Sequence, residues 1–135
     1  MNVLTRSVYS YLILFLLLLT SCEQAITPER LYGKWKYIKL ENPGANPPST
    51  EPDWKLKAES PYIEFSKNNE LTIWWQGSVL SHGTFKVDVK NIRYKEVLPG
   101  GGTREFPFYV SKLTDKEIVF ETLGAEGSRV TAVKQ

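Results

Sequence analysis

The feature that most constrains the fold is a series of short alternating segments that runs from Pro61 to the C-terminus. In residues 79–90, Phe85, Val87 and Val89 alternate with polar side chains, which is the pattern of a strand with one buried face. Turn residues interrupt the chain about every eight to twelve positions, a spacing typical of sandwiches and barrels. We therefore expect an all-β domain.

Residues 35–40 and the segments after Pro61 together predict about eight antiparallel strands in a meander. Closing such a sheet into a barrel removes its two edges, and eight strands leave room inside for side chains or one small ligand. Thr27 and Pro28 are suited to start one short helical turn, which should end by Gly33. Residues 42–60 hold four of the eight prolines, so we expect a loop without regular structure there.

The N-terminus carries a second pattern. Arg6 precedes an apolar run from about Tyr11 to Leu19, and the small residues Thr20 and Ser21 then lead to Cys22. A membrane-spanning helix needs about 20 apolar residues, and the run here is about half that length. It is more typical of a leader that is removed than of a retained span.

The segment Leu19-Thr20-Ser21-Cys22 resembles the lipobox of bacterial lipoproteins. The resemblance implies that residues 1–21 are a signal peptide and that Cys22 carries the lipid that holds the protein to a membrane. Residues 22–27 would be the lipidated cysteine and tether, and residues 28–135 the barrel domain. The expected location is the outer membrane, facing the periplasm or the cell surface. The acid-poor start after Cys22 favours the inner leaflet.

Gly33-Lys34-Trp35 directly follows the expected helical turn and resembles the Gly-x-Trp signature of lipocalins. Residues 83–87 and 109–118 are similar to strand patterns of small bacterial lipocalin-like lipoproteins. The resemblance implies a lipocalin-like barrel in which a basic side chain near the last strand packs across the indole of Trp35. Arg129, the only arginine in the final strand region, is the expected partner.

Charge and composition exclude several function classes. One of the 17 basic residues, Arg6, lies in the leader, so 16 basic and 15 acidic residues remain, without the clustered basic excess of a nucleic-acid-binding protein. His82 is the only histidine and has no metal-ligand spacing around it. The glycines at 100–102 lack the lysine of a phosphate loop and read as a hairpin tip. We therefore expect neither an enzyme nor a cofactor.

Aromatic residues are the better functional clue, with four Trp, seven Tyr and six Phe in the chain. In residues 71–76 the period of two predicts that Trp75 is buried and that Trp74 points outward, unless the strand is bulged. An outward tryptophan can contact a ligand or partner, or be covered by the loop that carries Trp54. The candidate contact residues are Trp54, Trp74 and Tyr109.

Two hypotheses for function follow. The first is a lipid-anchored binding or interaction module whose ligand is a small apolar molecule, a glycan or a protein. The alternative is an envelope inhibitor or assembly factor that uses a filled barrel as a scaffold for residues 42–60 and 98–103. A side-chain-filled interior favours the scaffold, and a pocket of a few hundred cubic ångströms favours a carrier.

Overall fold

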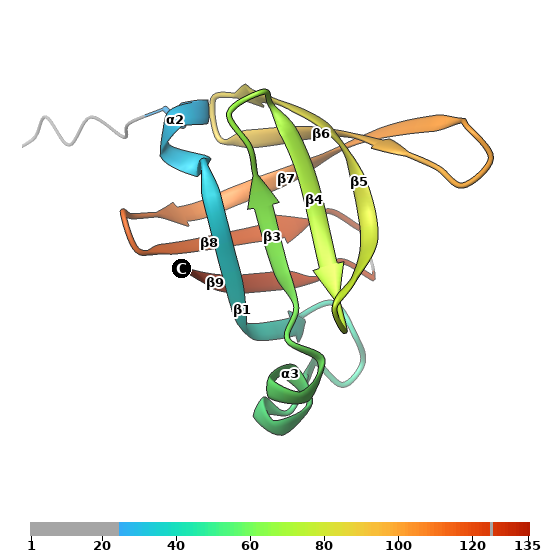
Figure 1. Cartoon of the computed structure of the whole chain (residues 1–135). Coiled ribbons are helices and arrows are strands. Elements are labelled where there is room, and N and C mark those ends of the chain that lie inside the picture. Colours follow the sequence, from blue (N-terminus) through green and yellow to red (C-terminus); the bar gives the residue numbers. More distant parts are fainter. Residues whose placement is uncertain (1–24, 125) are drawn as a thin grey trace, which may run out of the picture.

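A computed structural model describes residues 25–124 and 126–135 and shows a closed antiparallel β-barrel (Figure 1). The strands are β1 (Gly33–Asn42), β2 (Ser49–Thr50), β3 (Tyr62–Phe65), β4 (Glu70–Trp75), β5 (Ser78–Asp88), β6 (Asn91–Val97), β7 (Thr103–Leu113), β8 (Glu117–Thr122) and β9 (Arg129–Lys134). The two described helices are α2 (Pro28–Leu31) and α3 (Asp53–Glu59).

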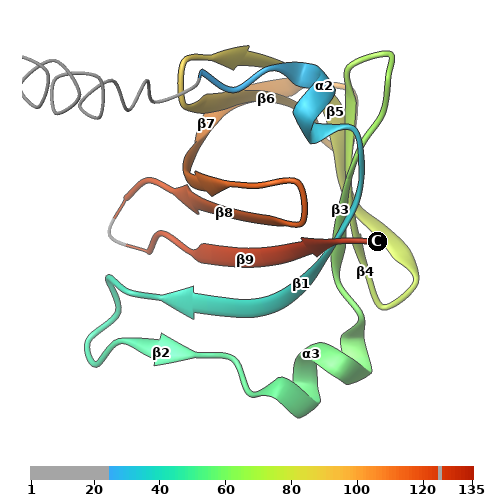
Figure 2. The same cartoon turned by 90° about the vertical axis from the view of Figure 1, so that its left-hand side faces the viewer.

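The barrel is a meander that closes on its first strand. From β3 to β9 each strand pairs with the next, and β1 pairs with both β3 and β9. The short strand β2 pairs only with Glu41 and Asn42 at the end of β1, outside the closed ring (Figure 2). The expected all-β barrel of eight strands, preceded by one short helical turn, is confirmed.

Residues 42–60 differ from the expected loop, because they contain β2 and the two-turn helix α3. Pro52 precedes the helix, where its missing N–H costs no hydrogen bond. From Lys55 to Glu59 every residue is a strong helix former. Burial of the Leu56 side chain against β1 and an ion pair between Glu51 and Lys55 at 2.8 Å hold the helix. The prolines therefore delimit a helix here instead of excluding one.

The barrel has two chemically different ends, which we call the α2 end and the α3 end. The α2 end holds helix α2, the turns that follow β3, β5 and β7, and the C-terminus. The α3 end holds helix α3, strand β2 and the turns that follow β4, β6 and β8. The hairpin of β6 and β7 extends beyond the rest of the barrel, on the right in Figure 1.

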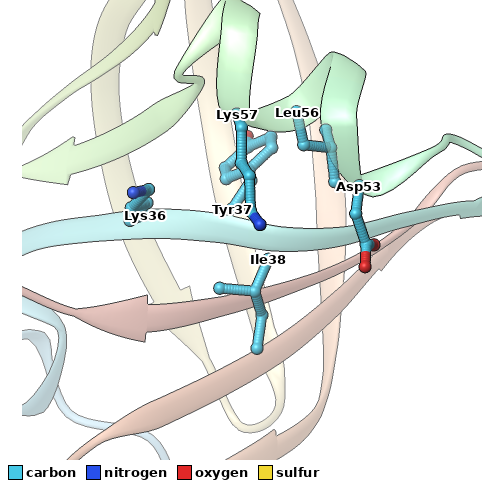
Figure 3. Close-up of a pocket in the computed structure, with 6 residues that line it drawn as sticks. All are labelled: Lys36, Tyr37, Ile38, Asp53, Leu56 and Lys57. Carbon is cyan, nitrogen blue, oxygen red and sulfur yellow. The ribbon is translucent and has the colours of Figure 1, made fainter.

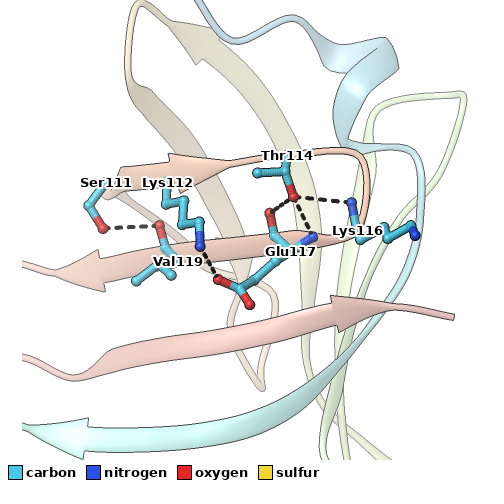
Figure 4. Close-up of polar contacts among 6 residues, drawn as sticks. All are labelled: Ser111, Lys112, Thr114, Lys116, Glu117 and Val119. Carbon is cyan, nitrogen blue, oxygen red and sulfur yellow. Dashed lines mark hydrogen bonds and ion pairs between the residues drawn. The ribbon is translucent and has the colours of Figure 1, made fainter.

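The turn after β7 shows how local sequence sets the α2 end. The hydroxyl of Thr114 accepts hydrogen bonds from the backbone N–H groups of Lys116 and Glu117 at 3.2 and 3.0 Å (Figure 4). Lys112 and Glu117 form an ion pair at 2.7 Å across the same hairpin. The threonine hydroxyl thus gives two backbone N–H groups of the turn a hydrogen-bond acceptor.

Aromatic side chains fill the interior. The ring of Phe120 lies 6.1 Å from that of Tyr37 and 5.2 Å from that of Phe108, and Phe108 stacks on Tyr94 at 5.7 Å. Trp35, Phe65 and Phe85 belong to the same buried cluster. These rings come from adjacent and next-but-one strands and belong to one buried cluster, so the interior holds packed side chains.

The predicted inward orientation of Val89 is wrong, because this residue lies in the turn between β5 and β6. Asp88 pairs with Asn91, so Val89 and Lys90 form a two-residue turn and Val89 leaves the inward face. Its side chain is 68 % exposed and its φ is 53°. Strand alternation predicted an inward Val89 because no Gly or Asn marks the first position of the turn. In the structure the strand ends at Asp88, before the valine.

Candidate functional site

The closure of the α2 end is built around Trp35. The indole Nε1 donates a hydrogen bond to the backbone oxygen of Leu31 at 2.7 Å, which fixes helix α2 against the barrel. The Lys134 ammonium lies 4.9 Å from the centre of the Trp35 ring. A Cβ on Gly33, whose φ is +125°, would meet the Lys134 side chain at 3.1 Å. Gly33, Trp35 and Lys134 therefore lie together where β1 pairs with β9.

The predicted cation, Arg129, is wrong. In the pairing of β1 with β9, Trp35 lies opposite Lys134, whereas Arg129 lies opposite Glu41 near the other end of the strand. The Arg129 guanidinium instead binds the Glu121 carboxylate. Sequence reasoning chose an arginine because its planar group stacks well on an indole, but antiparallel register brings the last residues of β9 to the start of β1.

Trp74 and Trp75 point to opposite faces of β4, but their burial differs less than predicted. Trp75 packs against the core, edge-on to Tyr37 at 6.3 Å. Trp74 lies on the outer face and stacks on Tyr62 at 5.6 Å. Both side chains are half-buried. A bulge changes the register between β4 and β5 at this point, leaving Leu80 without a pairing partner in the ladder.

The outer face of β3 and β4 therefore carries a small aromatic stack. The Lys34 ammonium lies 5.6 Å from the ring centre of Tyr62, on which Trp74 stacks. Within the described residues, the indole N–H of Trp74 is buried without an acceptor. Trp54 is 70 % exposed, so the stacking partner of Trp74 is Tyr62 and the ring of Trp54 stays mostly in solvent.

Tyr109, the third candidate, is half-buried on β7, opposite Asn91 and Glu121. In strand order β5 and β6 separate it from Trp74. Trp54, Trp74 and Tyr109 thus do not form one site.

A polar relay lines the inner wall at the α3 end. The Tyr94 hydroxyl donates to Ser81 Oγ at 2.6 Å, and Ser81 Oγ donates to Glu96 Oε1 at 2.6 Å. The Arg104 guanidinium binds the second oxygen of Glu96 and also lies 5.3 Å from the ring centre of Phe106. Alternation explains this placement, because Glu96 follows the buried Ile92 and Tyr94 on one face of β6.

The relay holds Glu96 in its ionised form. Burial raises the pKa of the carboxyl, but the hydrogen bonds from Ser81 and Arg104 and the positive charge of Arg104 outweigh it, so the pKa lies below the usual range. Burial is also the main cause that raises the pKa of Tyr94. A general acid or base needs a pKa near the working pH. Here the pKa of Glu96 is lowered and that of Tyr94 is raised, so both move away from neutral pH. The relay suits a fixed charge in a binding surface better than proton transfer.

A hollow of ≈ 380 Å³ lies next to the relay, where β7 extends past the end of β8. Its lining includes Arg104, Phe106 and Thr122 from the strands and Leu123, which is 70 % exposed. A second hollow of ≈ 180 Å³ separates α3 from β1 and is lined by Lys36, Tyr37, Ile38, Asp53, Leu56 and Lys57 (Figure 3). Both hollows lie outside the packed core.

Several exposed apolar side chains belong to the α3 end. Trp54 on α3, Leu80 at the start of β5 and Leu123 after β8 are 70 %, 63 % and 70 % exposed. Val97, at the end of β6, is 39 % exposed. They come from separate segments of the same end, and Leu123 also lines the larger hollow; we call these residues the rim.

Other candidate chemistry is sparse. His82 is exposed on β5, and the described residues contain no group of three or more His, Cys, Asp and Glu side chains that could hold a metal ion. Neither described helix has the length and apolar character needed to cross a bilayer. Cys22, the predicted lipidation site, lies outside the described residues.

Sequence reasoning missed the relay and Lys134. Both follow from register: once the hairpin tip is placed at residues 98–102, Glu96 and Arg104 become cross-strand partners of opposite charge. The sequence carried this signal, but it becomes visible only when each strand is aligned with its neighbour.

No protein-family model, curated protein or solved structure matches this chain.

Proposed function

We propose that this protein is a lipid-anchored cell-envelope interaction module that binds a protein partner through the α3 end of its barrel. Cys22 would carry the anchor, and the barrel would act as a rigid scaffold. The observation that carries the proposal is the exposed apolar rim of Trp54, Leu80 and Leu123 at the end opposite α2. Large exposed apolar side chains are typical of interaction sites, and tryptophan is enriched where binding energy concentrates.

The filled interior supports a scaffold over a carrier. Aromatic rings on neighbouring strands are in continuous contact inside the barrel, from Tyr37 through Phe120 and Phe108 to Tyr94, and all four belong to one buried cluster. A lipocalin-like carrier would need this space for its ligand. The proposed partner therefore meets the rim of the barrel.

The ionised Glu96 adds specificity to this rim. Arg104 is partnered by Glu96 yet its side chain is 62 % exposed, so the pair presents charge to the solvent beside an apolar hollow. Charged groups placed among apolar side chains fix how a partner is oriented more than they strengthen its binding.

Site-specific photo-crosslinking tests the proposal. Benzoylphenylalanine placed at Trp54 or Leu123, in cells that produce the protein, should yield the same discrete adducts with a partner protein. The same residue at Lys95, exposed on the outer face of β6, is the control and should yield none of them. Leu80→Asp should weaken the adducts from position 54 without changing the unfolding midpoint. Adducts that form equally from position 95, or none from the rim, would reject the α3 end as the binding site.

The photo-crosslinking also separates other ligands. A glycan or small molecule bound at the rim would produce adducts whose added mass is not that of a protein. That outcome would keep the site and replace the proposed partner class.

A further inference from the structure

The N-terminal segment is attached to the α2 end of the barrel. The backbone N–H of Ile26 donates to the Val89 oxygen at 3.0 Å, and the Ile26 side chain is 7 % exposed within the core cluster. Cys22 precedes Ile26 by four residues. At about 3.5 Å per extended residue, an anchor at Cys22 keeps Ile26 within about 14 Å of the membrane surface. The α2 end then faces the bilayer.

Basic side chains are distributed over this end. Each of its three turns contributes one lysine: Lys67 after β3, Lys90 after β5 and Lys116 after β7. Lys134 adds a fourth ammonium beside Trp35.

Acidic side chains at this end are partly neutralised by ion pairs. Asp88 binds Arg93 at 3.0 Å and Glu117 binds Lys112 at 2.7 Å, whereas Glu29, Glu70 and Asp115 also lie at this end. The α3 end is richer in acids and carries Glu51, Asp53, Glu59, Glu96, Glu105, Glu121 and Glu126. The charge distribution thus favours an anionic surface at the α2 end.

Val89 stands at the tip of this end in an unusual conformation. Its φ of 53° is a strained, left-handed value for a β-branched residue, and its side chain is 68 % exposed. The turn would be easier to form with Asn or Gly. An exposed apolar residue at this place, next to the attached N-terminal segment, is suited to contact with lipid.

We propose that the α2 end rests on an anionic phospholipid surface, with Val89 inserted among the headgroups and Lys67, Lys90 and Lys116 facing the phosphates. The inference rests on the anchoring part of the proposed function and adds the orientation: the membrane holds one end of the barrel, and the apolar rim of the α3 end points away from it.

Lipid photo-crosslinking tests the orientation. The full chain, purified from membranes of cells that produce it, is placed in vesicles of phosphatidylcholine with one quarter phosphatidylglycerol. Benzoylphenylalanine at Val89 should form phospholipid adducts, detected by mass, at least fivefold more often than at Leu80. Leu80 is the matched control because it is similarly exposed, at 63 %, on the α3 end. Exchanging Lys67 and Lys116 for serine should lower the yield at position 89 severalfold.

The outcomes separate the two proposals. Equal yields at positions 89 and 80, with a fatty acid found on Cys22, would overturn the orientation and keep the anchor. A high yield at position 89 with no fatty acid on Cys22 would overturn the lipid anchor and keep the orientation. A yield that does not respond to loss of the two lysines would reject their contact with phosphate.

Discussion

The Lys134 ammonium lies 4.9 Å from the centre of the Trp35 ring, where the first strand meets the last. A cation over an indole at a solvent-exposed position contributes about 0.5–1 kcal/mol. Lys134→Ala should therefore lower the free energy of unfolding in urea by about that amount, and Lys134→Arg should preserve it. Lys95→Ala, at an exposed strand position, is the control. An equal loss in both alanine variants would show that the cation contributes nothing specific.

Trp74→Phe tests the buried indole N–H. A buried donor without an acceptor costs about 1–3 kcal/mol, so phenylalanine should lose ring volume but remove this penalty while keeping the stack on Tyr62. We expect a change within about 1 kcal/mol in urea unfolding. Trp75→Phe, the matched control on the inner face, should cost more because it opens space against Tyr37. A larger loss at position 74 than at position 75 would contradict the assignment.

Glu96 should make stability depend on acid. Its pKa is lowered in the folded state because Ser81 and Arg104 hold the ionised form, which more than offsets the effect of burial. The stabilisation is therefore present above the unfolded value of about 4.3 and is lost as pH falls through the lower folded pKa. The free energy of unfolding of Glu96→Gln should lie below that of the natural protein at pH 7 and approach it toward pH 3. Glu105→Gln controls for the loss of one negative charge; parallel curves for Glu96→Gln and the natural protein would contradict the relay.

Val89→Asn should stabilise the barrel. Asparagine tolerates the left-handed conformation that costs valine about 1–2 kcal/mol, so the free energy of unfolding should rise by about 1 kcal/mol. Val79→Asn, at an exposed strand position outside the positive-φ residues, is the control and should gain nothing. Unchanged stability at position 89 would mean that the turn carries no strain.

Cys22→Ser tests the anchor itself. If Cys22 receives lipid, a fatty-acid analogue supplied to cells should label the natural protein and leave the serine variant unlabelled and released from membranes or uncleaved. Ser21→Ala keeps a small residue before the cysteine and should still be labelled. Label retained by Cys22→Ser would reject lipidation at this residue.

Sequence pattern predicted the barrel well because alternation and turn spacing are local properties. The clean alternation around Phe85 and the turn residues between strands sufficed for an eight-stranded meander. Helix α3 was missed because four prolines outweighed the helix formers from Lys55 to Glu59. Proline excludes helix interior positions, but it does not exclude a helix that starts after it.

The candidate site was predictable only in part, because it depends on register. Gly33 and Trp35 carried a local signature, whereas Lys134 and the pair of Glu96 and Arg104 follow from how strands align across the barrel. A single inserted residue at Leu80 shifts one pairing, and a two-residue turn at Val89 moves a valine from the core to the tip. Such offsets exchange the inward and outward faces of a strand, and the amino-acid composition does not reveal them.

The pairing of β1 with β9 also has a consequence for how the chain is made. The seam joins residues almost a hundred positions apart, so one edge of β1 stays unpaired until Arg129–Lys134 has left the ribosome or any channel that exports the chain. Long-range pairing of this kind slows folding, and open strand edges pair with other chains. Loss of the last seven residues would leave β1 and β8 open at once, so a truncated chain should aggregate although every other strand is present. Newly made protein therefore depends on being kept apart from its neighbours until its final strand is delivered.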